Sequence, residues 1–422
     1  MKRVAIATLG CKTNAFESAS IMDGFSGADF YLVPFEEEAD IYIINTCTVT
    51  NRTDFKSRNL IRKALSHKER NPAVRVVVTG CFAQRSYDEV HSLGKVDLVI
   101  DNQSKLDIAS LLDSSEERFE DIMQAREYSF RPVKGMVEHS RAFQKIQDGC
   151  DYRCTYCAVP YARGHSRSAT LEDILSQARL FVQNGYKEIV LGGVNLGLYK
   201  EGDIGLSEVV KSLQELDGLE LIRLSSLEPQ LLTSAILRSF RECSKVCPHF
   251  HIPLQSGCES VLRRMGRHYT TSEFTELIEN IIELYPDAAI GLDVITGFPG
   301  ETEEEFANTV ELLESLPIAY LHVFSYSKRK DTPAAQMPNQ IPGPIKTQRT
   351  GVLTALSTAK KEAYTALLIK RKQELRGVCE SITDGWGTFL SDHYIRCYLQ
   401  NPPPQGAICK VIPTQSHLDG VR

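Results

Sequence analysis

The 422-residue sequence contains one tryptophan, no long apolar run and no excess of positive charge. A helix that spans a bilayer needs about 20 mostly apolar residues, so we expect no membrane span. The opening residues MKRVAIATLGCKTN lack the apolar core of a signal peptide, and we therefore expect a cytoplasmic protein. The formal net charge of −6 excludes a uniformly basic surface for nucleic acid, but it does not exclude a local basic face.

Cysteine, in contrast, is abundant, with 12 residues. The thiols of a cytoplasmic protein stay reduced, so we favour metal ligation or catalysis over a disulfide framework. Six cysteines fall into two groups of three, which are described below. We expect the other six to pack as small apolar side chains: Cys243, Cys247, Cys258, Cys379, Cys397 and Cys409.

The first part of the chain alternates short apolar runs with helical patterns. The predicted strands are 3–9, 40–45, 74–79 and 97–100, and the predicted helices begin at 15 or cover 54–70 and 84–93. This alternation is typical of a doubly wound α/β domain, in which helices cover both faces of a parallel sheet. We assign residues 1–125 to this domain.

The second part repeats the α/β rhythm over a longer stretch, and the third part abandons it. Predicted strands of the second part are 188–191, 221–224, 249–254, 289–295 and 321–326. Their spacing favours a partial (β/α) barrel of parallel strands over residues 136–366. Short β-like runs separated by Gly, Asn and Pro then predict a small all-β domain over residues 369–422.

Three cysteines lie in one short segment with the spacing Cys150-x3-Cys154-x2-Cys157. A loop can wrap three such thiolates around one iron–sulfur cluster, which leaves one iron without a protein ligand. An open iron can bind a substrate or cofactor, as the open position of a catalytic zinc site does. The alternative is a structural zinc site with a fourth ligand elsewhere, such as His165.

Three further cysteines, Cys11, Cys47 and Cys81, each come directly after a predicted strand of the first domain. The carboxyl ends of parallel strands share one edge of a sheet, so these distant residues can converge there. Cysteines that merely fill a core would not all occur at the same topological point. We therefore expect a second metal site, with a redox-active set of thiols as the alternative.

The segment around Cys150, Cys154 and Cys157, with Tyr156 before the third cysteine, resembles the signature of the radical S-adenosylmethionine (SAM) enzymes. In that superfamily the open iron of a 4Fe–4S cluster binds SAM, and one-electron reduction releases a 5′-deoxyadenosyl radical. The resemblance implies that a glycine pair after the first strong barrel strand contacts SAM. Polar residues at later strand ends can also contact SAM, because barrel active sites are built there, and a packing or capping role is the alternative for each of them. The cofactor-binding residues implied in this way are Tyr156, Gly192, Gly193, Ser225, Glu228 and Gln255.

The whole chain resembles the methylthiotransferases of this superfamily, through the phrases GCKTN, NTCTVTN, VTGC, GCDYRCTYCAVPYARG, GGVNLGLY, RLSSLEP, HFHIPLQSGC and GFPGE. The resemblance implies two 4Fe–4S clusters. One would be held by Cys150, Cys154 and Cys157, and the auxiliary one by Cys11, Cys47 and Cys81. It also implies that SAM serves both as radical source and as methyl donor.

The residues Gly-Cys11-Lys12-Thr13-Asn14 resemble the MtaB type within this family. That type methylthiolates carbon 2 of N6-threonylcarbamoyladenosine at position 37 of tRNA. The resemblance therefore implies tRNA as partner, an electron donor such as flavodoxin or ferredoxin, and a monomer without membrane contact. It also implies that the last domain is a TRAM domain, an oligonucleotide-binding-like β-barrel that recognises RNA.

Two other interpretations stay open. The same chemistry could act on isopentenyladenosine in tRNA or on a ribosomal protein. A non-catalytic, RNA-binding iron–sulfur redox sensor is the second, and the open-iron loop argues against it. The seven cationic residues between Arg52 and Arg70 fit either a solvated helix face or a guide for the tRNA backbone.

Overall fold

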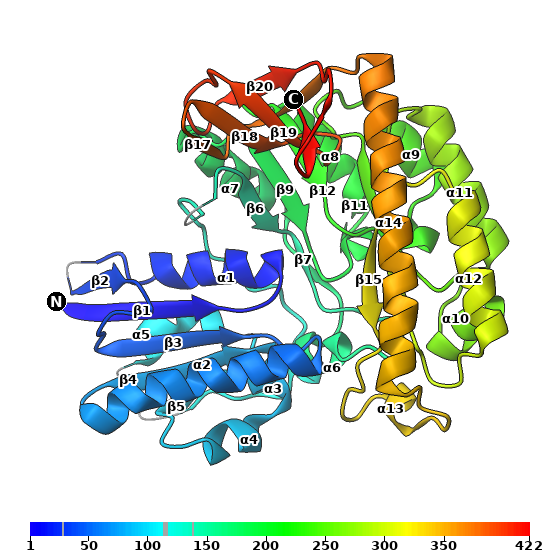
Figure 1. Cartoon of the computed structure of the whole chain (residues 1–422). Helices are drawn as coiled ribbons and strands as arrows, with labels where there is room; N and C mark the ends of the chain where they lie inside the picture. Colours follow the sequence, from blue (N-terminus) through cyan, green and yellow to red (C-terminus); the bar gives the residue numbers. More distant parts are fainter. Residues whose placement is uncertain (28, 113–116, 137–138) are drawn as a thin grey trace.

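The apolar runs at the start of the chain form a five-stranded parallel sheet in the computed structural model, which describes residues 1–27, 29–112, 117–136 and 139–422 (Figure 1). The strands, in spatial order, are β2 (Phe30–Val33), β1 (Lys2–Thr8), β3 (Ile41–Thr46), β4 (Arg75–Gly80) and β5 (Leu98–Val99). On one face Ile44 packs with Ile61 of α2 (Asn51–Arg70). On the other face Ile43 packs with Ile21 of α1 (Lys12–Asp23). Coverage on both faces confirms the doubly wound α/β domain.

Two details of this domain differ from the sequence prediction. Strand β2 was not predicted, although its sequence FYLV is apolar; it is a four-residue strand at the edge of the sheet and is only partly buried. The predicted helix 84–93 is confirmed only in part, since the chain forms two helices, α3 (Cys81–Arg85) and α4 (Tyr87–Ser92), with a non-helical break at Ser86. Helix α3 begins early because Gly80, with φ of 93°, turns the chain directly out of β4.

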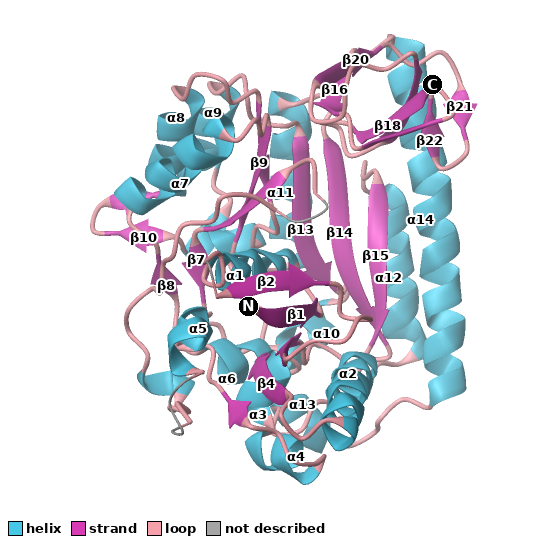
Figure 2. Ribbon diagram, turned by 90° about the vertical axis from the view of Figure 1, so that its left-hand side faces the viewer, coloured by secondary structure: helices cyan, strands magenta, loops and turns pink. Residues whose placement is uncertain are grey.

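Six parallel strands form the wall of the partial barrel, and helices cover its outer face (Figure 2). The strands are β6 (Ala142–Lys145), β9 (Glu188–Gly192), β12 (Leu221–Leu224), β13 (His249–Gln255), β14 (Ala289–Thr296) and β15 (Tyr320–Ser325). Two three-stranded sheets make up the wall, and the Leu227 amide joins them by donating to the His251 carbonyl at 2.9 Å. The five predicted strands are confirmed. The structure adds β6, which contains the polar residues Gln144 and Lys145 and therefore lacked an apolar signal.

The covering helices of the barrel are α7 (Leu171–Gln183), α8 (Leu206–Gln214), α9 (Ser234–Arg241), α10 (Glu259–Met265), α11 (Thr271–Leu284) and α12 (Glu303–Ser315). The longest helix, α14 (Gly343–Arg371), runs beside β15 and leads to the C-terminal unit (Figure 1). In the described part of the chain, no helix has both the length and the apolar character required to cross a membrane.

The C-terminal unit is all β, as the sequence predicts. Its strands are β16 (Leu375–Val378), β17 (Ser381–Thr383), β18 (Trp386–Leu390), β19 (Arg396–Gln400), β20 (Ile408–Val411), β21 (Ser416–His417) and β22 (Gly420–Val421). The unit packs on the amino ends of the barrel strands, where Tyr394 stacks on His249 with ring centroids 4.2 Å apart. It therefore lies at the end of the barrel opposite the carboxyl strand ends, where barrel active sites are built.

Candidate active site between two cysteine triads

The local cysteine triad lies in the loop that follows β7 (Gln147–Asp148), at the carboxyl end of the barrel strands. The amide of Asn195 donates to the Cys150 sulfur at 3.8 Å, and the guanidinium of Arg267 donates to the Cys154 sulfur at 3.4 Å. N–H donors aimed at sulfur suit thiolates better than thiols, because a thiolate is the stronger acceptor. These donors fit a set of metal-bound thiolates.

A single zinc ion with His165 as a ligand fits this loop less well. His165 is exposed and hydrogen-bonds through Nδ1 to Asp151 at 2.9 Å. Among the described residues, one group of His, Cys, Asp and Glu brings its ligand atoms within 4.8 Å of one another, and it contains no cysteine. Thiolates that bind different irons of one cluster lie farther apart than the ligands of a single ion. The wider triad therefore suits a cluster.

The predicted glycine pair follows β9 and lies against the start of the cysteine loop. A Cβ on Gly193 would lie 2.8 Å from Oε1 of Gln147, so no side chain fits there. The same Gln147 oxygen accepts the amide N–H of Asn195 at 2.8 Å. Gly192 and Gly193 thus place the backbone of this turn beside the segment that leads into Cys150.

The other predicted SAM contacts gather at the carboxyl strand ends. Tyr156 and Gln255 line one cavity, and Gln255 has a left-handed φ of 68°. Glu228 forms an ion pair with Arg267, the residue that also donates to Cys154. The hydroxyl of Ser225 is buried and has no hydrogen-bond partner in the described structure, so it is available to a ligand.

The second triad, Cys11, Cys47 and Cys81, converges at the carboxyl edge of the N-terminal sheet. A Cβ on Gly10 would lie 2.6 Å from the Cys47 sulfur, so the turn before Cys11 packs directly on Cys47. Arg163 donates through Nε to the Cys81 sulfur at 3.3 Å. Burial, with the nearby charges of Cys81 and Cys11, raises the pKa of Cys47 to about 12. A metal group would offset that penalty, because a coordinated thiol is deprotonated.

A buried ion network joins the two triads, and sequence reasoning missed it. Glu17 of α1 accepts hydrogen bonds from Lys105, from Lys145 at 2.8 Å and from Arg163 at 2.8 Å. Arg163, at the end of α6 (Val159–Arg163), also bonds Asp148. The buried charged members are Glu17, Lys105, Lys145, Asp148, Arg163 and Arg167. Four cations against two carboxylates leave an excess of positive charge beside Cys81, which suits an anionic group bound there.

A cavity of about 230 Å³ lies between the local triad and the loop that follows Cys47. Cys157 lines it on the barrel side, and Val49 and Thr50 line it on the side of the Cys47 loop. Its remaining lining residues include Asp293, Ile295, Phe324, Tyr326 and Arg329. The cavity therefore brings Cys157 of the local triad opposite the loop that follows Cys47, whereas Cys11, Cys47 and Cys81 are not among its lining residues.

Arg329 holds the Cys47 loop against the barrel side of this cavity. Its guanidinium donates to Asp54 at 2.6 Å, to Thr48 at 2.8 Å and to Asn51 at 2.6 Å. Because Arg329 is buried and its guanidinium makes three hydrogen bonds to this loop, the contact between the two domains is specific. No motif in the sequence marks Arg329, because its partners are more than 270 residues away.

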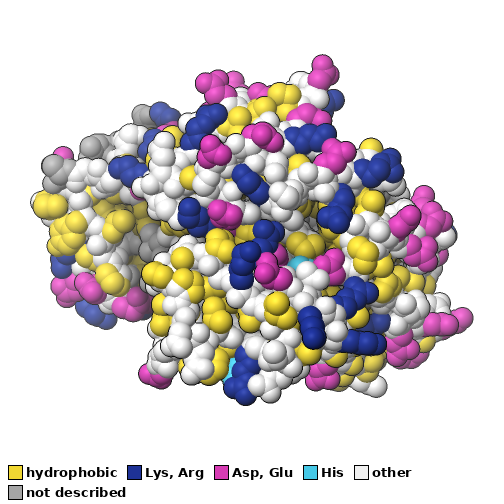
Figure 3. Space-filling view, turned by 90° about the horizontal axis from the view of Figure 1, so that it is seen from above, with side chains coloured by type: hydrophobic (Ala, Val, Ile, Leu, Met, Phe, Trp, Pro, Cys, Tyr) yellow, Lys and Arg dark blue, Asp and Glu magenta, His cyan; other side chains and the backbone are white. Residues whose placement is uncertain are grey.

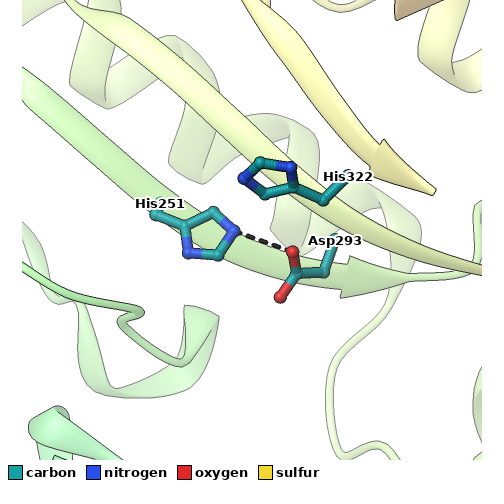
Figure 4. A group of neighbouring side chains, drawn as sticks. All are labelled: His251, Asp293 and His322. Atoms are coloured by element: carbon teal, nitrogen blue, oxygen red, sulfur yellow. Dashed lines mark hydrogen bonds and ion pairs between the residues drawn. The ribbon is translucent and has the colours of Figure 1, made fainter. Parts of the chain in front are cut away.

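Below the cavity, the inward side chains of the barrel form a polar layer (Figure 4). His251, Asp293 and His322 come from three adjacent strands, and His251 Nε2 hydrogen-bonds to Asp293 at 2.8 Å. Ser226 bonds the other ring nitrogen of His251 at 2.7 Å. Asp293 also lines the cavity, so this layer is continuous with the space between the triads.

Known proteins resemble the chain over most of its length. A family model described as the radical SAM superfamily matches residues 145–313, and one described as uncharacterized protein family UPF0004 matches residues 3–101. The threonylcarbamoyladenosine tRNA methylthiotransferase MtaB of Bacillus subtilis (strain 168) is 40% identical over 87% of this chain and 82% of its own. The protein of the same name from Aquifex aeolicus (strain VF5) is 39% identical over 86% and 89%.

A solved structure also resembles the fold. The radical S-adenosylmethionine methyltransferase TsrM from Kitasatospora setae has a TM-score of 0.61 over 79% of this chain and 77% of its own. Its sequence is 14% identical, so this likeness concerns the fold alone.

Proposed function

Because the chain belongs to the MtaB type of the radical SAM methylthiotransferases, we propose that it methylthiolates carbon 2 of N6-threonylcarbamoyladenosine at position 37 of tRNA. The observation that carries this proposal is the cavity between Cys157 and the loop that follows Cys47. Cys157 and the loop that follows Cys47 line opposite sides of it. A base held there lies between a radical source and a sulfur source.

On the barrel side, Cys150, Cys154 and Cys157 would hold a 4Fe–4S cluster. With SAM bound, this cluster supplies the 5′-deoxyadenosyl radical, which can abstract hydrogen from an unactivated carbon. The protein residues orient SAM. We assign Tyr156, Gly192, Gly193, Ser225, Glu228 and Gln255 to this role, because they surround the triad at the strand ends.

On the N-terminal side, Cys11, Cys47 and Cys81 would hold the auxiliary 4Fe–4S cluster, which supplies the sulfur. Arg163 supports an anionic group here, since it donates to Cys81 and belongs to a network with excess positive charge. A second SAM would supply the methyl group. Because Gly10 has no side chain, space for a bound group stays open beside Cys47.

The surface beside the cavity suits an RNA stem-loop. Helix α2 begins next to the cavity, and Arg52, Lys56 and Arg62 are exposed on it without an ion-pair partner among the described residues. Phe55 is 56% exposed and Val49 is 55% exposed, which offers apolar surface to an unstacked base. Phosphate contacts by such cations supply much of the affinity for RNA.

We propose that the C-terminal β unit is a TRAM-like domain that contacts the same tRNA. Its face carries Lys and Arg interspersed with Asp and Glu (Figure 3), so its role in this proposal rests on the resemblance and not on charge. Because tRNA is the substrate, we propose a cytoplasmic enzyme. It would act as a monomer and receive electrons from a donor such as flavodoxin or ferredoxin.

The decisive experiment uses reduced, iron–sulfur-reconstituted protein with SAM and anticodon stem-loops that carry either N6-threonylcarbamoyladenosine or isopentenyladenosine. Mass spectrometry of the nucleosides should show the methylthio product only from the first substrate. Product only from isopentenyladenosine, or only on a ribosomal protein, would overturn the substrate. Absence of 5′-deoxyadenosine with every substrate would favour the redox sensor instead.

A further inference from the structure

Lys12 follows Cys11 at the start of α1, and its side chain enters the lumen of the barrel. Its ammonium lies 5.7 Å from the centroid of the Phe143 ring, on the β6 side. The positive charges of Arg141 and Arg223 repel the Lys12 ammonium, and the Lys12 charge in turn opposes protonation of His322 of β15. Lys12 is solvent-exposed although barrel side chains surround it, as expected for a residue that projects into the open lumen of the barrel.

The charges around Lys12 leave it without a partner. The carboxylate of Glu188 attracts the Lys12 ammonium, but Glu188 already forms an ion pair with Arg223 at 2.7 Å. Arg141 pairs with Glu380 at 2.7 Å. In the described part of the chain, no carboxylate forms an ion pair with Lys12. The lumen therefore presents an accessible cation that suits an anionic ligand.

The polar layer beside Lys12 fits the same ligand better than it fits a metal. His251, Asp293 and His322 lie close enough together to hold an ion. However, both nitrogens of His251 are engaged, one by Ser226 and one by Asp293. The nearby positive charge of Lys12 opposes a divalent cation. Asp293, which His251 holds in place, and His322 can instead hydrogen-bond to a polar group that enters from the cavity.

We propose that this lumen binds the substituent on N6 of the target adenosine, and that Lys12 binds the carboxylate of its threonyl group. The inference rests on the proposed function and deepens it. With the base in the cavity, Asp293 and His322 face the hydroxyl and urea groups of the substituent. An isopentenyl group has no polar atom for these partners and would leave Lys12 desolvated and unpaired, so the subsite rejects it.

The first test compares wild-type protein with Lys12→Met on a stem-loop that carries N6-threonylcarbamoyladenosine. Loss of a hydrogen bond to a charged group should lower kcat/KM on the order of tenfold to a hundredfold. Lys12→Arg keeps the charge and should retain most of the activity. Lys211→Met is the matched control, since it removes an exposed lysine from the outer helix α8, and it should behave as wild type.

The second test uses a stem-loop in which the threonyl carboxylate is a methyl ester. Wild type should prefer the acid to the ester, whereas Lys12→Met should treat the two alike. The ratio of the two rates is taken within one preparation, so any loss of cluster cancels. An acid preference in Lys12→Met equal to that of wild type would overturn the inference and leave the proposed function standing. If wild type forms no product from the acid, the proposed function itself fails.

Discussion

Replacing Glu17 with glutamine should destabilise the protein by about 3–5 kcal/mol, because it removes one partner of a buried ion network. The Glu17 carboxylate is fully buried and bonds Lys105, Lys145 and Arg163. Burial opposes its ionisation, but the three cations outweigh burial and hold the pKa of Glu17 well below its usual range. Glutamine would turn an N–H₂ group toward these donors and leave three buried cations undercompensated.

Urea denaturation under anaerobic conditions, followed by far-UV circular dichroism, measures this loss. With a slope of about 2–3 kcal/mol per molar urea, the midpoint should fall by roughly 1–2.5 M. The control is Glu242→Gln, since Glu242 is exposed and pairs with Lys211 at 3.5 Å, and it should cost less than about 1 kcal/mol. A Glu17→Gln protein as stable as this control would show that the buried ion network around Glu17 does not stabilise the fold.

The double variant Glu17→Gln/Lys105→Met isolates the charge effect. It returns the network to its wild-type net charge, because one cation is removed together with one carboxylate. Its loss of stability should be smaller than the sum of the two single losses by about 0.5–3 kcal/mol. Strict additivity would show that Glu17 and Lys105 stabilise the fold independently, against the network described above.

Two further perturbations test other parts of the molecule. Gly10→Ala should lose the iron of the auxiliary site in elemental analysis and keep that of the radical site, because its Cβ would lie 2.6 Å from the Cys47 sulfur at a φ of 101°; full iron content would contradict this packing. Burial lowers the pKa of His393, but hydrogen bonds to Asp287 and Asp392 outweigh burial and raise it. The stability gained over His393→Gln should therefore be complete below the ordinary pKa of 6.5 and disappear as pH rises through the raised value. Melting temperatures of both proteins between pH 6 and 9 check this, and a constant difference would refute it.

The sequence predicts those features whose signals are local. Cys150, Cys154 and Cys157 are close in the chain, and the strands that precede Cys11 and Cys47 are continuous apolar runs. Parallel-sheet geometry then suffices to predict the convergence of the second triad. Strand β6 escapes prediction because its buried Gln144 and Lys145 are stabilised by partners elsewhere in the fold.

The remaining features depend on contacts between distant residues. Arg163 stands in the motif CAVPYARG, but only the structure shows that it reaches Glu17 and the Cys81 sulfur. Lys12 belongs to the sequence motif GCKTN. Its position inside the barrel, however, depends on how the N-terminal sheet packs against the barrel. Such tertiary pairings have no local propensity or spacing that could reveal them.

The two cysteine triads are proposed to have separate roles: one supports radical formation from SAM, and the other supplies the sulfur. Cys47→Ala protein, reduced and supplied with SAM and a stem-loop that carries N6-threonylcarbamoyladenosine, tests this proposal in one reaction that measures 5′-deoxyadenosine and the methylthio nucleoside together. We expect that 5′-deoxyadenosine forms and that no methylthio nucleoside appears. Formation of the methylthio nucleoside by this variant, or loss of both products at once, would contradict the proposal.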